Sequence, residues 1–505
     1  MIAGLPLLIA TCPGRSILAV KSQLRQAARG GADLGEVRVD RLDPKERSRL
    51  GELFPSPLPL VATLRSRSEG GEGPDSSDER TPLLESVAQL PFQLLDLERA
   101  HDGPLLRNAG PKLGQAETLI ISSHLPESAS LREVRRLLEM PRPPGTVAKV
   151  VLPCTFERLW SDLLPGLSPF EAYVPYILHT TGPTGSILRA WAHRFGMFAV
   201  YASLPAAASG ELPESVEPSQ LPVDRLRNFL RAGAGGSLFG VVGHPIHHSR
   251  SPAVHSLWMQ REHRSGLYLA LDIETAQELA ESLGPLAAGG FRGLNVTHPW
   301  KQVALSLASQ ALPAAEAAAC ANTLSFAPDT ISAENTDVAA VRRRLSELKE
   351  EGSWDESPVA VLGGGGAARS ALAAVSSLGN SAIVFARRPE VAEALAREYG
   401  GQVGTGTLRK PARVVIHATP AGREENPRLD LPWTEVVDGS THLLDFVYQP
   451  VHTFLRDGAL SRGATYEDGS KLLVYQAAES YATWWGTPPS LELQEAALKE
   501  VMCAA

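Results

Sequence analysis

Short apolar runs alternate with helix-like stretches through the first 230 residues, and this alternation constrains the fold more than any other feature. Helical spacing is clearest in Ser130–Met140, Phe156–Leu164 and Gly185–Phe195. Eight strands alternating with helices over this length predict an α/β fold, a (β/α)8 barrel. A doubly wound sheet would also fit, but no glycine-rich phosphate turn follows any of these runs. The expected strands are Leu5–Cys12, Leu34–Asp40, Leu58–Arg65, Phe92–Glu98, Thr118–His124, Thr146–Pro153, Ala172–Leu178 and Met197–Ser203.

Polar residues gather where several of these strands end, which in a barrel brings them to one catalytic mouth. Taken singly, each of these residues is weak evidence for a catalytic site, since an Arg or Glu at a strand end is usually solvated and a lone His is usually structural. They are Glu36, Arg38, Asp40, Arg65, Glu98 and His124.

Lys149 is harder to dismiss, because it lies inside the apolar run TVAKVVLP. Burying an ammonium without a partner is costly, and a desolvated lysine with a lowered pKa is what Schiff-base chemistry requires.

The motifs EVRVD, TLRSRSEGGE, SSH, VAKVVLP and GSILRAW, in this order, resemble type I 3-dehydroquinate dehydratase over about residues 1–230. The resemblance implies that Lys149 forms an imine with the substrate ketone and that His124 moves protons at C2 and at the leaving hydroxyl. It also implies that Glu69 supports His124. Substrate-holding roles are implied for Glu36, Arg38, Arg65, Arg189 and Gln220, with Arg189 on the carboxylate.

The sequence departs from that family in three places. Val216-Glu-Pro-Ser-Gln220 stands where the family has Ser-Ala-Pro-Gly-Gln, so a substrate-contacting serine is missing or shifted to Ser215. Tyr201 replaces a phenylalanine, which we regard as a mild change. The loop Pro205–Pro222 is long, and a mobile lid and a merely flexible segment are equally open interpretations.

A glycine run, GGGGAARSALAAV, follows the apolar strand Val359–Leu362 and opens a helix. Glycines there permit a tight turn and the close approach of a phosphate to free N–H groups. The next strand, Ala382–Ala386, ends in Arg387 and Arg388, with no acidic residue in the ribose-binding position. This pattern predicts a Rossmann fold that prefers NADP to NAD.

The segments around this turn, GHPIHHSRSP, NVTHPWK, CANTL, AENTD and EDGSKLLVYQAAES, resemble shikimate dehydrogenase over about residues 238–505. The resemblance implies that Lys301 and Asp337 are the catalytic pair. It implies substrate contacts by Ser249, Ser251, Thr297, Asn322 and Gln476. Cofactor contacts are implied for Gly363, Gly364, Gly365, Gly366, Ala367, Arg387, Arg388, Thr419 and Tyr448. Two departures are Ala386-Arg387-Arg388 for Asn-Arg-Thr and His244 for an asparagine.

These patterns divide the chain into a barrel over 1–231, a linker over 232–237 and a two-domain reductase. Within the reductase we expect a substrate domain over 238–340 and 470–505 and a Rossmann domain over 341–469. The reaction expected is dehydration of 3-dehydroquinate, then NADPH-dependent reduction of 3-dehydroshikimate to shikimate, two consecutive steps of one pathway.

Charge and cysteine content narrow the partners and the compartment. Of 48 Lys and Arg and 56 Asp and Glu, 26 of each lie in residues 1–235, so the net charge of −8 belongs to the remainder. Neither half has the basic surplus of a nucleic-acid binder, and no apolar run is long enough to span a membrane. Four dispersed cysteines without metal-ligand spacing favour no metal and a cytoplasmic location; the partners expected are the small-molecule substrates.

Two alternatives remain open. One is a quinate/shikimate dehydrogenase that works in catabolism, which the two arginines disfavour if it uses NAD. The other is a non-catalytic repressor built from the same domains, which should have lost residues such as Lys149 and Lys301.

Overall fold

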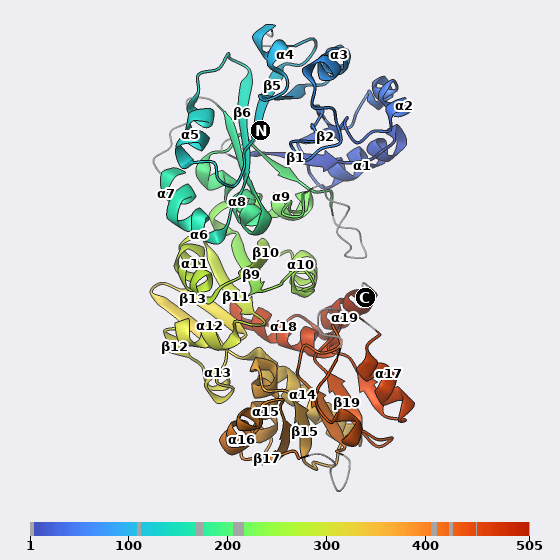
Figure 1. Cartoon of the computed structure of the whole chain (residues 1–505), viewed down its shortest axis with the longest axis vertical. Helices are drawn as coiled ribbons and strands as arrows, with labels where there is room; N and C mark the ends of the chain where they lie inside the picture. The colour runs from blue at the N-terminus through green and yellow to red at the C-terminus, as the bar shows by residue number, and fades with distance from the viewer. Residues whose placement is uncertain are drawn as a thin grey trace. The chain divides into compact units, whose positions relative to one another are not determined.

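The computed structural model of the chain describes residues 5–108, 113–167, 175–205, 217–405, 412–423, 428–450 and 452–503. The chain divides into two compact units, with the main boundary at Ser237–Leu238; the short segments Ser265–Leu267 and Glu281–Pro285 group with the first unit. Each is coloured by residue number in Figure 1. No helix of the described residues is long and apolar enough to cross a membrane.

An eight-stranded parallel sheet forms the first unit, in the order β7-β6-β5-β4-β3-β2-β1-β8. The N–H of Phe198 donates to the carbonyl of Tyr176 (2.8 Å) between the two end strands, so the barrel is nearly closed. The strands are β1 Leu7–Cys12, β2 Leu34–Arg38, β3 Leu60–Thr63, β4 Leu94–Glu98, β5 Thr118–His124, β6 Thr146–Pro153, β7 Tyr176–Thr181 and β8 Ala199–Ala202. The helices are α1 Ile17–Arg29, α2 Pro44–Arg47, α3 Ser77–Ala88, α4 Gly103–Asn108, α5 Leu131–Glu139, α6 Phe156–Arg158, α7 Leu164–Leu167, α8 Gly185–Ala190 and α9 Val223–Ala232.

The expected barrel is therefore confirmed, with strand ends that differ by a few residues. Two expected helices are interrupted. Phe156–Leu164 divides into α6, a π-helical turn at Leu159–Leu163 and α7, while Gly185–Phe195 ends as α8 and continues as a 3-10 turn at Ala192–Phe195. The segment 206–216, which contains most of the loop Pro205–Pro222 and Ser215, lies outside the described residues.

Each of the eight strands places a polar side chain in the barrel interior, above an apolar layer. The lower layer includes Ile9, Val61, Ile120, Val147 and Ile177, all nearly inaccessible to solvent. Strands alternate their side chains between two faces, so one polar residue per strand is enough to form a complete inner ring. The ring, all buried, consists of Thr11, Glu36, Thr63, Asp96, Ser122, Lys149, His179 and Tyr201.

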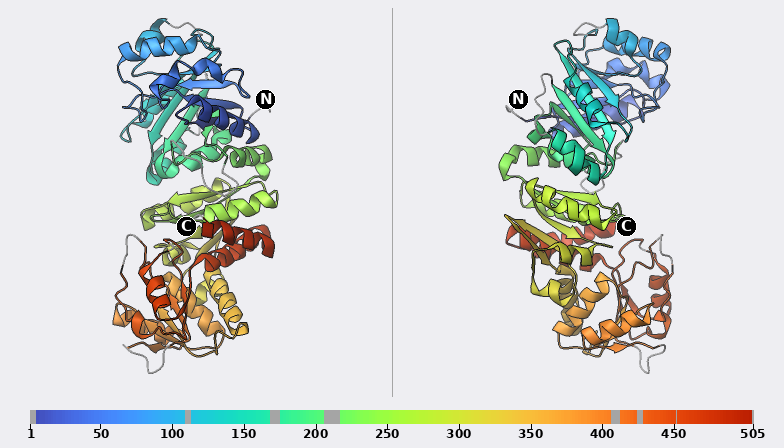
Figure 2. Two further views of the ribbon diagram at one scale, coloured as in Figure 1. Left: turned by 90° about the vertical axis from the view of Figure 1, so that its right-hand side faces the viewer. Right: turned by 60° about the vertical axis from the view of Figure 1, so that its left-hand side comes forward.

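Two six-stranded sheets form the second unit. The first sheet is mixed, in the order β10-β9-β11-β13-β14-β12. Its strands are β9 Ser237–Gly243, β10 Gly266–Asp272, β11 Phe291–Val296, β12 Gln310–Ala311, β13 Thr323–Ala327 and β14 Thr330–Glu334. Its helices are α10 Ser251–Arg261, α11 Ala276–Ala288, α12 Lys301–Leu307, α13 Pro313–Ala317, α14 Thr336–Glu350, α18 Ser470–Trp485 and α19 Leu491–Cys503. Two further views show the red helices α18 and α19 beside this sheet (Figure 2).

The other sheet is parallel, in the order β17-β16-β15-β18-β19-β20, the doubly wound order of a Rossmann fold. Its strands are β15 Val359–Leu362, β16 Ala382–Phe385, β17 Gln402–Val403, β18 Val414–His417, β19 His442–Asp445 and β20 Thr465–Glu467. Its helices are α15 Gly366–Ser377, α16 Pro389–Glu398 and α17 Phe454–Ser461. This confirms the Rossmann expectation; the proposed boundaries at 340 and 470 remain a prediction.

Candidate functional sites

Lys149 is held in the barrel interior by a carboxylate from another strand. Its Nζ donates to Asp96 Oδ2 at 2.8 Å, and both side chains are buried. Burial lowers the pKa of Lys149, while the nearby Asp96 carboxylate opposes that shift. The Lys149 ammonium and the Arg65 guanidinium hold the pKa of Asp96 below its usual range, although burial alone would raise it.

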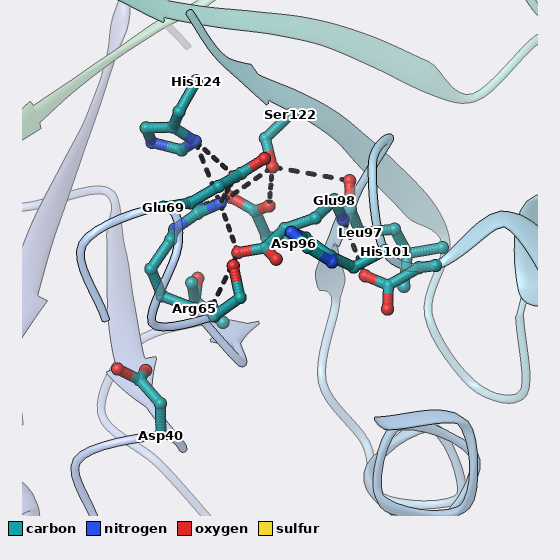
Figure 3. Close-up of polar contacts among 12 residues, drawn as sticks. Asp40, Arg65, Glu69, Asp96, Leu97, Glu98, His101, Ser122 and His124 are labelled. Carbon is teal, nitrogen blue, oxygen red and sulfur yellow. Dashed lines mark hydrogen bonds and ion pairs between the residues drawn. The ribbon is translucent and has the colours of Figure 1, made fainter. Parts of the chain in front are cut away.

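Arg65 bonds to three acidic side chains, Glu69, Asp96 and Glu98, which Figure 3 shows around it. One guanidinium nitrogen contacts Glu69 at 3.0 Å and Glu98 at 2.8 Å, and the other donates to Asp96 at 3.1 Å. Ser122 Oγ donates to the second oxygen of Asp96 at 2.6 Å. A buried arginine that bonds to three carboxylates helps to fix their positions and to compensate their buried negative charge.

His124 closes the network at the end of β5. Its Nδ1 lies 2.6 Å from Glu69 Oε2 and 3.2 Å from Arg65 Nη1. Burial, Arg65 and Lys149 together hold the pKa of His124 well below its usual value. Burial raises the pKa of Glu69, against the attraction of Arg65. A neutral imidazole beside a carboxyl group is suited to receive a proton from a bound molecule.

The remaining residues expected in the first site lie on the same barrel but in separate hydrogen-bonded groups. Glu36 accepts from Thr11 and Thr63, each at 2.8 Å. Arg38 forms a two-point pair with Asp40, at 2.9 and 2.7 Å. Two others come from outside the strands: Gln220 Nε2 donates to Thr11 at 3.2 Å, and Arg189 Nη1 donates to Thr180 O, Gly185 O and Ser219 Oγ at 2.8–3.0 Å.

Glu69, Glu98 and His101 offer ligand atoms within 4.8 Å of one another, which is a possible metal-ligand grouping. Arg65 already bonds to both of these carboxylates. The two nitrogens of His101 are hydrogen-bonded to Ser68 Oγ and Asp75 O, each at 2.9 Å. The hydrogen bonds of Glu69, Glu98 and His101 to other protein groups therefore explain why these three side chains lie together.

Lys301 and Asp337 form the centre of the second site. Lys301 begins α12, Asp337 lies in the first turn of α14, and Nζ donates to Oδ2 at 2.5 Å. Asn335 caps α14 by accepting from the N–H of Val338 (3.3 Å), which fixes the turn that carries Asp337.

Buried amides and hydroxyls adjoin this pair. Asn322 Oδ1 accepts from the N–H of Thr336 (2.7 Å), and Asn322 Nδ2 donates to Gln476 Oε1 (3.4 Å). Asn295 and Thr323 extend the network through a hydrogen bond of 3.1 Å. The structure thus brings Lys301, Asp337, Asn322 and Gln476 to one region.

The expected serines and threonine lie on neighbouring loops. Ser249 Oγ accepts from the N–H of Ser251 at 3.4 Å, and Tyr448 OH accepts from the N–H of Arg250 at 3.4 Å. The backbone N–H of Thr297 donates to Val242 O at 2.9 Å, placing Thr297 beside the end of β9.

The glycine-rich turn fits a dinucleotide phosphate. Gly363 has a φ of +142°, and a Cβ there would lie 2.8 Å from the carbonyl oxygen of Ala418. A Cβ on Gly364 would lie 2.8 Å from Val391 Cγ1, whereas nothing lies within 4 Å of one on Gly365. No side chain caps the N-terminus of α15, which starts at Gly366 and continues through Ala367. The backbone therefore leaves space and N–H donors for an anion.

Arg387 and Arg388 follow β16 and are exposed, and their guanidinium groups bond to none of the residues that the structure describes. Arg369, in contrast, forms an ion pair with Glu398 at 3.0 Å. Thr419 lies after β18, where its hydroxyl is 2.5 Å from His417 Nε2, and His417 Nδ1 is 2.7 Å from Asp445. Thr419 Cγ2 would lie 3.3 Å from a Cβ on Gly363, so Thr419 borders the turn.

Sequence reasoning does not single out Asp96 or the His417–Asp445 pair, and it names Tyr201 only as a mild departure. Asp96 gave a usable signal, because a charged residue between Leu95 and Leu97 is as unusual as Lys149 in its own strand. Tyr201 was treated as a mild change, and the His417–Asp445 pair carried no signal, since the two residues are adjacent only through strand pairing.

Two family models match the chain, one in each half. The family model "Type I 3-dehydroquinase" matches residues 9–235, and "Shikimate dehydrogenase substrate binding domain" matches residues 241–324. The chain is similar to the shikimate dehydrogenase (NADP(+)) of Dinoroseobacter shibae, with 36% identity over 271 residues, 52% of this chain and 97% of that protein.

Two solved structures are also similar. The shikimate 5-dehydrogenase of Thermus thermophilus, in complex with NADP(H) and shikimate, shares 32% identity, covers 52% of this chain and 99% of its own, and has a TM-score of 0.47. The dehydroquinate dehydratase and shikimate dehydrogenase of S. pombe AroM shares 22% identity, covers 99% of both chains and has a TM-score of 0.44.

Proposed function

Because the chain belongs to the shikimate dehydrogenase family and carries a type I 3-dehydroquinase domain ahead of it, we propose that it catalyses two consecutive reactions. It dehydrates 3-dehydroquinate to 3-dehydroshikimate in the barrel and reduces that product to shikimate with NADPH in the second unit. The observation that carries the proposal is the buried Lys149 ammonium, 2.8 Å from Asp96 and in one network with His124.

In the dehydratase, the Lys149 ammonium first loses a proton to solvent, a step that burial favours by lowering its pKa. The neutral amine then attacks the substrate ketone, and the carbonyl oxygen leaves as water when the C=N bond forms. His124 takes a proton from the adjacent carbon, and the electron pair moves toward the imine nitrogen. The hydroxyl then leaves with a proton returned by His124, and the new C=C bond forms. Hydrolysis of the imine releases product and restores Lys149, so the net change is loss of one water.

Asp96 and Glu69 support these steps in different ways. Asp96 compensates the positive charge on the nitrogen of Lys149, before and after it becomes an iminium. Glu69 holds the imidazole of His124 through a contact of 2.6 Å. Arg189 is suited to the substrate carboxylate, because a guanidinium meets a carboxylate at two points. Glu36, Arg38, Arg65 and Gln220 complete the proposed contacts.

In the reductase, the dinucleotide supplies a hydride to the ketone carbon when it is bound. Lys301 donates the proton that the ketone oxygen needs, and Asp337 holds the ammonium in place at 2.5 Å. Ser249 and Ser251 are assigned to the substrate carboxylate, and Thr297, Asn322 and Gln476 to its hydroxyls.

The glycine turn, Gly363–Ala367, is proposed to hold the pyrophosphate, Arg387 and Arg388 the 2′-phosphate, and Thr419 and Tyr448 the nicotinamide side. A 2′-phosphate favours NADP, since two guanidiniums attract it and no carboxylate repels it. A non-catalytic repressor is disfavoured, because Lys149, His124, Lys301 and Asp337 all lie in bonded networks. Three buried free thiols, Cys12, Cys154 and Cys320, agree with the cytoplasm as the proposed compartment.

Trapping with borohydride tests the proposal. The full chain is treated with 3-dehydroquinate and sodium borohydride, digested and analysed by mass spectrometry. We expect one adduct, on Lys149, and none in Lys149→Ala; Lys21, Lys301 and the other lysines serve as internal controls. An adduct elsewhere, or no adduct, would refute the imine mechanism.

A further inference from the structure

The hydroxyl of Tyr201 stands out in the inner ring of the barrel. Tyr201 lies on β8 and is 3% exposed, and its hydroxyl oxygen has no hydrogen-bond partner among the described residues. Thr11, Glu36, Thr63, Asp96, Ser122 and Lys149 in the same ring are all hydrogen-bonded to one another or to Arg65. Because a buried unbonded hydroxyl costs free energy, this position requires an explanation.

The ring of Tyr201 lies against the reactive nitrogen. Lys149 Nζ is 4.0 Å from the ring centroid, a distance at which a cation is attracted by the aromatic face. The same face is positioned to meet the positive charge of an iminium at Lys149. The Tyr201 ring is fixed there, since its backbone N–H donates to His179 Nε2 (3.2 Å) and the two rings make an edge contact.

The surroundings keep this hydroxyl protonated, so that it acts as a donor. Burial, with Glu36 and Asp96, raises the pKa of Tyr201 well above its ordinary value. Two other polar atoms proposed to face the substrate are also buried and unbonded in the described structure, Gln220 Oε1 and Arg189 Nε. Gln220 lies beside Thr11 of the same inner ring, and Tyr201 lies beside Lys149, so a polar ligand in the barrel interior would meet unbonded polar atoms there.

We propose that Tyr201 is a further substrate-binding residue of the dehydratase, and that its hydroxyl donates a hydrogen bond to an oxygen of the substrate attached to Lys149. This inference rests on the proposed function. The type I 3-dehydroquinase family has a phenylalanine at this position, which would supply the aromatic face but no hydroxyl. The hydroxyl is therefore a contact that this chain adds, and it selects for a substrate with an oxygen at that point.

Tyr201→Phe tests the assignment, because it removes one oxygen and leaves the ring in place. We expect kcat/KM for dehydration to fall about tenfold, the loss typical of one hydrogen bond, while reduction of 3-dehydroshikimate is unchanged. The Tm should stay the same or rise, because an unbonded buried hydroxyl is lost.

Tyr176→Phe is the matched control. Tyr176 is also buried in the barrel, but its hydroxyl already donates to Phe195 O. Its loss should lower Tm and leave kcat/KM unchanged.

Two results would overturn the proposal. If Tyr201→Phe keeps the wild-type kcat/KM, the hydroxyl contacts no substrate. If kcat/KM and Tm fall together, the hydroxyl is bonded within the protein and its role is structural. The same experiment measures dehydration by the wild-type chain and the borohydride adduct on Lys149. If the proposed function is wrong, the wild-type chain itself is inactive, which distinguishes that failure from a failure of the Tyr201 assignment.

Discussion

Lys149 and Asp96 form a buried ion pair, with Nζ 2.8 Å from Oδ2, between β6 and β4. The strands β4 and β6 are not neighbours in the sheet, because β5 lies between them. β5 carries Ser122, whose hydroxyl donates to the second oxygen of Asp96. The pair keeps the amine at a fixed point in the barrel while burial favours its neutral form.

Asp96→Asn should therefore harm both activity and folding. The change leaves the cations of Lys149 and Arg65 with one anion fewer, which costs about 3–5 kcal/mol for a broken buried pair. We expect a lower Tm and loss of most dehydratase activity, measured by thermal unfolding and by the absorbance of 3-dehydroshikimate. Glu52→Gln is the control, since it makes the same chemical change in the exposed pair with Arg49, which solvent screens, and it should leave the Tm nearly unchanged. Equal effects of the two variants would contradict this assignment.

Acid should destabilise the second unit through His255. This residue is buried against Tyr268, and burial lowers its pKa from 6.5 to about 3. Below pH 6.5, His255 binds a proton in the unfolded chain but stays neutral in the folded chain. The free energy of unfolding therefore falls as the pH drops from about 6.5 to 3. The slope contributed is about 1.4 kcal/mol per pH unit.

His255→Phe keeps the stacked ring and removes the titrating group. The Tm of the variant should fall less between pH 7 and pH 5 than that of the wild type, with exposed His263→Phe as control. The same pH dependence in His255→Phe and the wild type would argue against a neutral buried His255.

The two activities should be separable by substitution. Lys301→Met removes the proposed proton donor and should lower reduction of 3-dehydroshikimate by roughly 10²–10⁴-fold. Dehydration of 3-dehydroquinate should stay within a few-fold, because Lys301 lies in the other unit. Lys349→Met, at an exposed pair with Glu356, should change neither rate. Loss of both activities in folded Lys301→Met would show that the units depend on each other.

Cofactor choice should depend on the two arginines after β16. Arg387→Ser with Arg388→Asp should weaken the apparent affinity for NADPH by tenfold or more per arginine, since each charge-assisted bond contributes about 1.5–3 kcal/mol. NADH use should rise relative to NADPH, with 3-dehydroshikimate affinity unchanged. Arg397→Ser, on the exposed face of α16, is the control. If the double variant still prefers NADPH, the phosphate is held elsewhere, and Arg369 becomes the candidate despite its pair with Glu398.

Much of this arrangement could be predicted from local sequence. Two expected strands, Thr118–His124 and Thr146–Pro153, have the bounds of β5 and β6, because each is a mainly apolar run with a clear end, at His124 in one and at Pro153 in the other. The mouth of a parallel barrel then brings His124 and Lys149 together without any knowledge of side-chain contacts.

The hydrogen-bond and ion-pair partners of the site residues could not be predicted from local sequence. Arg65 reaches Asp96, Glu98 and Ser122 across three strands, and such contacts depend on side-chain rotamers and strand register rather than on sequence spacing. Tyr201 is indistinguishable from a core aromatic in the sequence, and only its unbonded hydroxyl beside Lys149 sets it apart.

The most direct test of the central claim is a coupled assay with the purified full chain, 3-dehydroquinate and NADPH and no other enzyme. The account predicts that NADPH is oxidised until one equivalent is consumed per 3-dehydroquinate, with shikimate as product, and that Lys149→Ala oxidises NADPH only when 3-dehydroshikimate is added. No oxidation of NADPH by the wild-type chain with 3-dehydroquinate would contradict it, as would equal oxidation by Lys149→Ala.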